Sequence, residues 1–147
     1  MLADTLKTLL ATAYALSIKA QNFHWNVEGP NFPQYHSFFG DYYSEVYDNT
    51  IDKLAEIIRQ LDSYTPGSIT RYAELSQIED QTKIPRAELM MQELHYDNDI
   101  ILGMYKQAFH VEEEADEQGI CDFIAGRIDA HAKHKWMLRS ILKTQRA

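Results

Sequence analysis

The stretch LADTLKTLLATAYALSIKAQNFHWNV, residues 2–27, decides the fold class of this chain. Its apolar residues recur at alternating steps of four and three, which is the spacing of one face of an α-helix. The residues on that face are Leu2, Leu6, Leu9, Ala13, Leu16, Ala20, Phe23 and Val27. The turn-forming sequence EGPN follows at residues 28–31, so we predict a first long helix that ends close to residue 27.

Further helices are predicted beyond this turn. A second begins near Pro33, because proline is favoured in the first helical turn, and runs to about Asp62. Residues 68–78 can form a short helix, and a third long helix spans about residues 85–110. A fourth begins near Glu117, after a predicted N-cap at Asp116. We therefore predict an all-α four-helix bundle, with a short extra helix in its long middle crossover, as a single domain over residues 1–147.

The composition places the chain among ordinary globular domains. It has 147 residues, of which 45% are hydrophobic and 24% charged, and it contains only 6 Gly and 4 Pro. The single Cys121 cannot form an internal disulfide and suits a reducing compartment. A net charge of −8 makes nucleic acid a poor partner and cations better ones.

The sequence also bears on localisation. No segment has the ~18 consecutive apolar residues that a membrane span requires. Residues 9–16 resemble a short signal-peptide core, but Asp4 precedes them and the helical rhythm continues beyond any cleavage point. We expect a cytoplasmic protein that makes no use of a membrane.

Five carboxylates follow one face of the predicted second helix. At 100° per residue they lie within a stripe of about 80°. They are Asp41, Glu45, Asp48, Asp52 and Glu56. Like charges four residues apart repel by roughly 0.2–0.5 kcal/mol per pair, and no Lys or Arg lies within the stripe. Two interpretations are open: a solvated acidic face, or a site where a hard cation such as iron, manganese or magnesium turns repulsion into coordination.

Two histidines favour the cation site. His24 lies at the end of the first helix and His36 near the start of the second, and imidazole with carboxylate is the ligand set of non-haem iron. Asp41 and Asp52 share a helix face but lie ~16 Å apart along its axis, so they cannot bind one metal within a chain. They could if two copies of this helix packed antiparallel about a two-fold axis. No Glu-x-x-His motif, typical of di-iron sites inside one bundle, is present.

These residues resemble the signature of the Dps mini-ferritins, a ferritin-like family of DNA-binding proteins from starved cells. The resemblance spans nearly the whole chain, and its most specific part is HWNVEGPNF at residues 24–32 with the downstream carboxylates. It implies a hollow homo-dodecamer, and a ferroxidase that oxidises Fe(II) with hydrogen peroxide in preference to dioxygen, stores the ferric mineral and protects against oxidative damage.

The resemblance also implies a site at the dimer two-fold axis that holds one or two iron ions. One subunit supplies His24, His36 and Asp41, and its partner supplies Asp52 and Glu56, with Trp25 beside the iron. Asp116, Asp122 and Asp129 match acidic three-fold pores that draw in iron, and Glu45 and Asp48 are candidates for mineral nucleation. We expect His131 and His134 to form a surface pair, and the basic residues from Arg127 onward to form a solvated face.

Two features depart from the family pattern. Four residues separate His36 from Asp41, where the family has three, so a regular helix would point these side chains ~140° apart. We predict a π-type bulge near Phe38–Gly40 that takes up the extra residue.

The second departure concerns DNA. A basic N-terminal extension is missing, and the C-terminal tail offers only Lys143 and Arg146, so we expect weak or no DNA binding. Two alternatives are a DNA-compacting structural protein with weak ferroxidase activity and a helical interaction module without metal.

Overall fold

The computed structural model describes residues 2–143, and Arg146 of the predicted basic tail lies outside this range. The described chain contains six helical segments and no strand. They are α1 (Leu2–Asn26), α2 (Phe32–Asp48), α3 (Ile51–Gln60), α4 (Ile69–Leu75), α5 (Ala87–Glu114) and α6 (Gln118–Leu142). The predicted all-α bundle with a short extra helix in its long middle crossover is confirmed.

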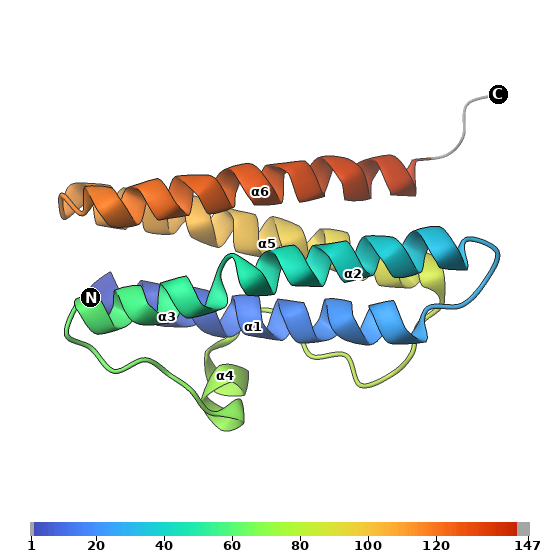
Figure 1. Cartoon of the computed structure of the whole chain (residues 1–147), viewed down its shortest axis with the longest axis horizontal. Helices are drawn as coiled ribbons and strands as arrows, with labels where there is room; N and C mark the ends of the chain where they lie inside the picture. The colour runs from blue at the N-terminus through green and yellow to red at the C-terminus, as the bar shows by residue number, and fades with distance from the viewer. Residues whose placement is uncertain (1, 144–147) are drawn as a thin grey trace.

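Two antiparallel helix pairs make up the bundle (Figure 1). One pair is α1 with α2 and its continuation α3, and the other is α5 with α6. A long crossover that carries α4 along the outside returns the chain to the opposite end of the bundle before α5 begins. This connection lets α5 run in the same direction as α2 and α3, as in bundles with one long crossover.

The apolar face of the first helix forms the centre of the core, as its spacing predicts. Leu6, Leu9, Leu16 and Phe23 have no exposed surface, and they pack among buried residues of the other long helices. The crossover is held to α1 by polar and aromatic contacts. The Gln77 amide donates a hydrogen bond of 3.1 Å to Thr12 Oγ1, which places the crossover against the bundle.

Helix boundaries differ from the prediction at two places. The predicted second helix is interrupted at Asn49–Thr50, where Thr50 is fully buried, and it continues as α3. The N-cap of α6 is Glu117 rather than Asp116, which has a φ of 61° and closes the end of α5. The Glu117 amide donates a hydrogen bond of 2.9 Å to the Glu112 carbonyl, which closes the turn at the end of α5. Asp116 belongs to this turn and therefore does not cap α6.

Among the described residues, no helix combines the length and the apolar character needed to cross a membrane.

Candidate metal centre

His24 and His36 face each other across the short turn between α1 and α2. His24 Nδ1 lies 2.6 Å from the His36 carbonyl oxygen, and His36 Nδ1 lies 2.7 Å from the His24 carbonyl oxygen. The two rings stack with centroids 3.9 Å apart and planes 14° apart. A carbonyl only accepts, so each Nδ1 carries a proton and donates it, which leaves Nε2 as the ring nitrogen that can bind a metal. This is the arrangement of metal-binding histidines, whose other ring nitrogen donates to a carbonyl or carboxylate.

Gly40 makes the close approach of these helices possible. A Cβ atom at this position would lie 2.8 Å from His24 Cε1 and 2.9 Å from its Nδ1, closer than carbon atoms tolerate. The His24 ring therefore rests on the backbone of α2. The sequence marked Gly40 as the site of a bulge, but its role in the structure is to accommodate this ring.

The predicted π-bulge is absent, because α2 is a regular α-helix from Phe32 to Asp48. Asp41 is exposed and lines a groove between α2 and α6, whereas His24 contacts Tyr43 on the α1 side of α2, with ring centroids 5.6 Å apart. The prediction fails because nothing in α2 requires the loss of a backbone hydrogen bond that a bulge entails. Within one chain the structure does not bring Asp41 to the histidine pair.

The remaining predicted ligands lie farther along the chain. Asp52 and Glu56 are exposed on α3, beyond the interruption at Asn49–Thr50. Within residues 2–143 of a single chain, no three His, Cys, Asp or Glu side chains are placed to hold a metal ion together. The ligand roles of Asp41, Asp52 and Glu56 remain predictions, and so do the pore roles of Asp116, Asp122 and Asp129, which are exposed.

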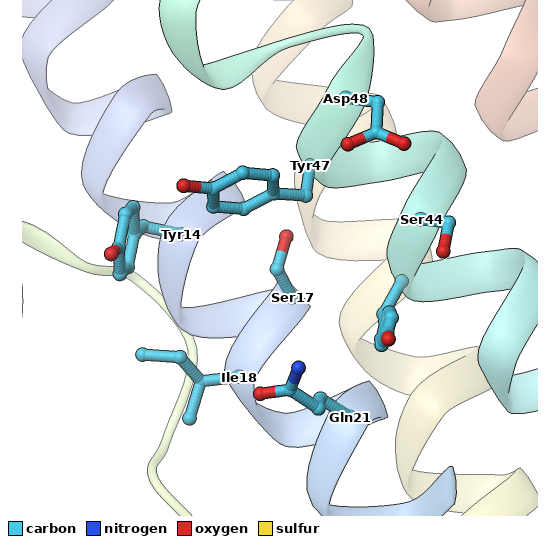
Figure 2. Close-up of a pocket in the computed structure, with 8 residues that line it drawn as sticks. Tyr14, Ser17, Ile18, Gln21, Ser44, Tyr47 and Asp48 are labelled. Carbon is cyan, nitrogen blue, oxygen red and sulfur yellow. The ribbon is translucent and has the colours of Figure 1, made fainter.

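The face of α1 and α2 that carries the histidine pair is open and partly apolar. Trp25 is 64% exposed, Ile18 51%, Tyr47 46% and Phe32 40%. A groove between the two helices runs along this face, and Figure 2 shows its lining. Hydroxyl groups and the Asp48 carboxylate border the groove beside the apolar side chain of Ile18. Exposed aromatic side chains of this size next to candidate ligands are typical of a surface that another protein covers.

Glu45 does not belong to a solvated acidic face. Its carboxylate receives two hydrogen bonds from Arg127, at 2.6 and 3.0 Å, and a third contact of 2.7 Å from His134 Nε2. Burial alone would raise the pKa of Glu45, but the hydrogen bonds from His134 and Arg127 hold it well below its usual range. The candidate role of Glu45 in nucleation stays a prediction, made for a carboxylate that is already engaged.

Two expectations for the fourth long helix are wrong. His131 is fully buried and His134 is 8% exposed, so they are not a surface pair, and Arg127 is 4% exposed rather than solvated. Burial, followed by the charge of Arg127, lowers the pKa of His131 well below its usual value. Neighbouring lysines suggested exposure, but the helical position of each residue decides it: the three side chains lie on the core side of α6, three or four residues apart.

The chain matches known proteins over almost its whole length. Residues 3–147 match the ferritin-like domain family, which defines the class of protein. The low temperature-induced protein all0458 of Nostoc sp. PCC 7120 is 32% identical over 92% of this chain and 76% of its own length. The DNA protection during starvation protein of Brevibacillus brevis is 31% identical over 97% of this chain and 95% of its own.

A solved structure extends the likeness to three dimensions. The crystal structure of Dps from Staphylococcus aureus superimposes with a TM-score of 0.93 at 30% identity, covering 98% of this chain and 96% of the other. The chain therefore belongs to the Dps family of ferritin-like proteins.

Proposed function

We propose that this chain is an iron-oxidising and iron-storing mini-ferritin whose oxidation sites form between two subunits. His24 and His36 of one subunit would bind Fe(II) together with Asp52 and Glu56 of its partner. The observation that carries this proposal is the reciprocal hydrogen bonding of the two histidines, at 2.6 and 2.7 Å, which leaves both Nε2 atoms available. The Dps protein of Vibrio cholerae O1, 28% identical to this chain, is described as a member of a superfamily of ferritin-like diiron-carboxylate proteins.

The ligand set supports a shared site. One chain contributes two imidazoles. A further ligand on the same helix face would lie four residues after His36, but this position holds Gly40, which has no side chain to bind a metal. We infer that the residue added relative to the family spacing is taken up at the Asn49–Thr50 interruption, ahead of Asp52 and Glu56. Asp41 is left outside the proposed set because α2 turns it toward α6.

The chemistry follows from hard anionic ligands. Carboxylates stabilise Fe(III) over Fe(II), so a site with two carboxylates and two imidazoles favours loss of an electron. Two Fe(II) ions give one electron each to hydrogen peroxide, which takes up two protons and becomes two water molecules. The ferric product would then accumulate within a closed assembly, for which we propose twelve subunits.

Variants of the acidic residues test the site. The Asp52→Asn, Glu56→Gln double variant is expected to lose rapid Fe(II) oxidation, by at least about tenfold, with helicity unchanged, because it removes the anionic half of the ligand set. Asp41→Asn is the matched control and should keep most of the rate. Stopped-flow absorbance after addition of Fe(II) and peroxide measures both. Loss of oxidation in Asp41→Asn, with the double variant active, would contradict the assignment.

DNA compaction is not favoured by the charge of the chain, 14 Lys and Arg against 22 Asp and Glu. A gel-shift at low salt should show little retention of DNA, and any retention should vanish as salt is added. Iron oxidation at such sites would serve protection against peroxide, and we place the protein in the cytoplasm on the basis of its single cysteine.

A further inference from the structure

A second group of side chains, of the kinds that serve as metal ligands, lies inside the bundle, away from the histidine pair. It consists of Glu45 on α2 with His131 and His134 on α6, and a carboxylate with two imidazoles is a ligand set for non-haem iron and related divalent metals. The imidazole ring centroids of His131 and His134 lie 5.3 Å apart. Four-helix bundles build metal sites at this place, from side chains of facing helices.

Arg127 connects these groups. Its Nη1 donates to Glu45 Oε2 at 2.6 Å, and its Nη2 lies 3.0 Å from Glu45 Oε1 and 3.1 Å from His131 Nε2. His134 Nε2 lies 2.7 Å from the same Oε1 atom. The guanidinium therefore stands where the carboxylate and the imidazole converge, and Arg127 as a whole is 4% exposed.

The protonation of His131 follows from its partners. A guanidinium only donates, so His131 Nε2 accepts from Arg127 and carries a lone pair. The proton of the neutral ring is then on Nδ1, which donates to Asn98 Oδ1 at 2.8 Å. Asn98 returns a bond of 3.0 Å from its Nδ2 to the His131 carbonyl, so the ring is fixed in the tautomer that a metal ligand needs.

We propose that Arg127 acts as a built-in cation in the place of a metal ion, so that Glu45, His131 and His134, which are not placed to hold a metal with the guanidinium between them, could bind one only in its absence. The guanidinium supplies the positive charge that these groups would otherwise take from a metal ion. Arginine suits this role because it stays protonated in proteins and matches a carboxylate with two parallel hydrogen bonds.

Closure of this site has a consequence for where metal binds. Glu45 and His134 border the groove between α2 and α6, so an ion in solution could reach them if the guanidinium were absent. With Arg127 in place the bundle interior is kept free of iron, and binding is directed to other sites on the chain. The inference concerns the bundle core alone and does not depend on the proposed oxidation site between subunits.

Cobalt binding tests the inference in a background without the subunit-interface carboxylates. The parent carries Asp52→Asn and Glu56→Gln, and the test variant adds Arg127→Met, which keeps the length of the side chain but removes its charge. We expect the test variant to bind about one additional Co(II) per chain, at least about tenfold more tightly than the parent, with visible absorption bands of low-symmetry cobalt. Adding Glu45→Gln to the test variant should abolish both the extra ion and the bands.

Two further measurements keep the result decisive. Because Arg127→Met leaves the half-buried Glu45 carboxylate without the guanidinium, the variant can fail to fold without metal. In that case refolding with Co(II) or Zn(II) should restore helicity, and the Glu45→Gln form should show no such metal dependence. A folded test variant that binds no more cobalt than the parent would overturn the proposal, as would an unfolded one that metal does not rescue. Tight cobalt binding by the parent that Glu45→Gln removes would also overturn it.

Discussion

Gly40 lies where the His24 ring comes into contact with the backbone of α2. A side chain at this position would collide with the His24 ring. This requirement for glycine is distinct from the general tendency of glycine to weaken a helix. Glycine in a helix interior costs roughly 0.5–1 kcal/mol relative to alanine, so its presence in α2 needs compensation. The stacked histidine pair, fixed by two hydrogen bonds to carbonyl oxygens, supplies it.

We predict that Gly40→Ala displaces the His24 ring and slows Fe(II) oxidation by at least about tenfold, since misplaced catalytic groups commonly cost that much. Gly103→Ala in α5 is the control, because nothing lies within 4 Å of a Cβ at that position. It should leave the oxidation rate unchanged and raise the free energy of unfolding by roughly 0.5–1 kcal/mol. Equal oxidation rates in the two variants would show that His24 does not need its observed position.

Side chains of α6 change the interpretation of the acidic stripe on the predicted second helix. Along the sequence, Glu45 has only like-charged neighbours, but in the fold it receives hydrogen bonds from Arg127 and His134, 82 and 89 residues away. Helix periodicity reveals the charges along one helix but not a cation that a distant helix supplies. The same limit explains why His131 and His134 were expected at the surface.

Local patterns predicted most of the fold, because helix periodicity and turn residues act over a few neighbouring positions. The apolar face from Leu6 to Phe23 is buried as predicted, and the short helix in the crossover is present. The contact between His24 and His36 was predictable from the turn that joins their helices. The interruption at Asn49–Thr50 was not predictable, because the burial of Thr50 depends on packing in the bundle core and not on the residues next to it in the sequence.

The end of α5 carries a buried carboxyl group that should make stability depend on pH. Glu112 is fully buried, and among the described residues neither of its carboxylate oxygens has a hydrogen-bond partner. Burial, and then the nearby charge of Glu117, raises the pKa of Glu112. Folding therefore favours the protonated form, and stability from this group is complete below its unfolded pKa and is lost as pH rises through the folded value.

We predict that Glu112→Gln stabilises the protein by about 1 kcal/mol at pH 8 and that the gain disappears near pH 4. Glu113→Gln is the control, since the Glu113 side chain is 63% exposed and should show no comparable pH dependence. Thermal unfolding at the two pH values measures both variants. A gain from Glu112→Gln that is equal at pH 4 and pH 8 would mean that folding does not raise the pKa of the Glu112 carboxyl group.

At the scale of the whole molecule, the partly apolar face of α1 and α2 matters most. It carries the exposed side chains of Trp25, Ile18 and Tyr47 beside the histidine pair, and a second copy of the chain would cover them. Covering this face on a two-fold axis would bury apolar surface and bring the carboxylates of α3 to the histidines in one step. The proposed assembly and the proposed chemistry would therefore depend on the same surface.

We predict a stable assembly of about twelve times the 17.1 kDa mass of one chain at micromolar concentration. Light scattering coupled to size exclusion measures the mass directly. A stable species with the mass of two chains would contradict the closed assembly but leave the shared site possible. A stable monomer would contradict both.

Mixed assemblies of two inactive variants test the central claim, that each oxidation site draws ligands from two chains. One variant lacks the histidines (His24→Ala, His36→Ala) and the other lacks the carboxylates (Asp52→Asn, Glu56→Gln). Each alone should be inactive. After dissociation and random reassembly in equal amounts, half of the dimers contain one chain of each kind and regain one intact site of two, so about a quarter of the wild-type oxidation rate should return. Mixed assemblies of the expected mass that stay as inactive as the parents would show that the site is not shared between subunits.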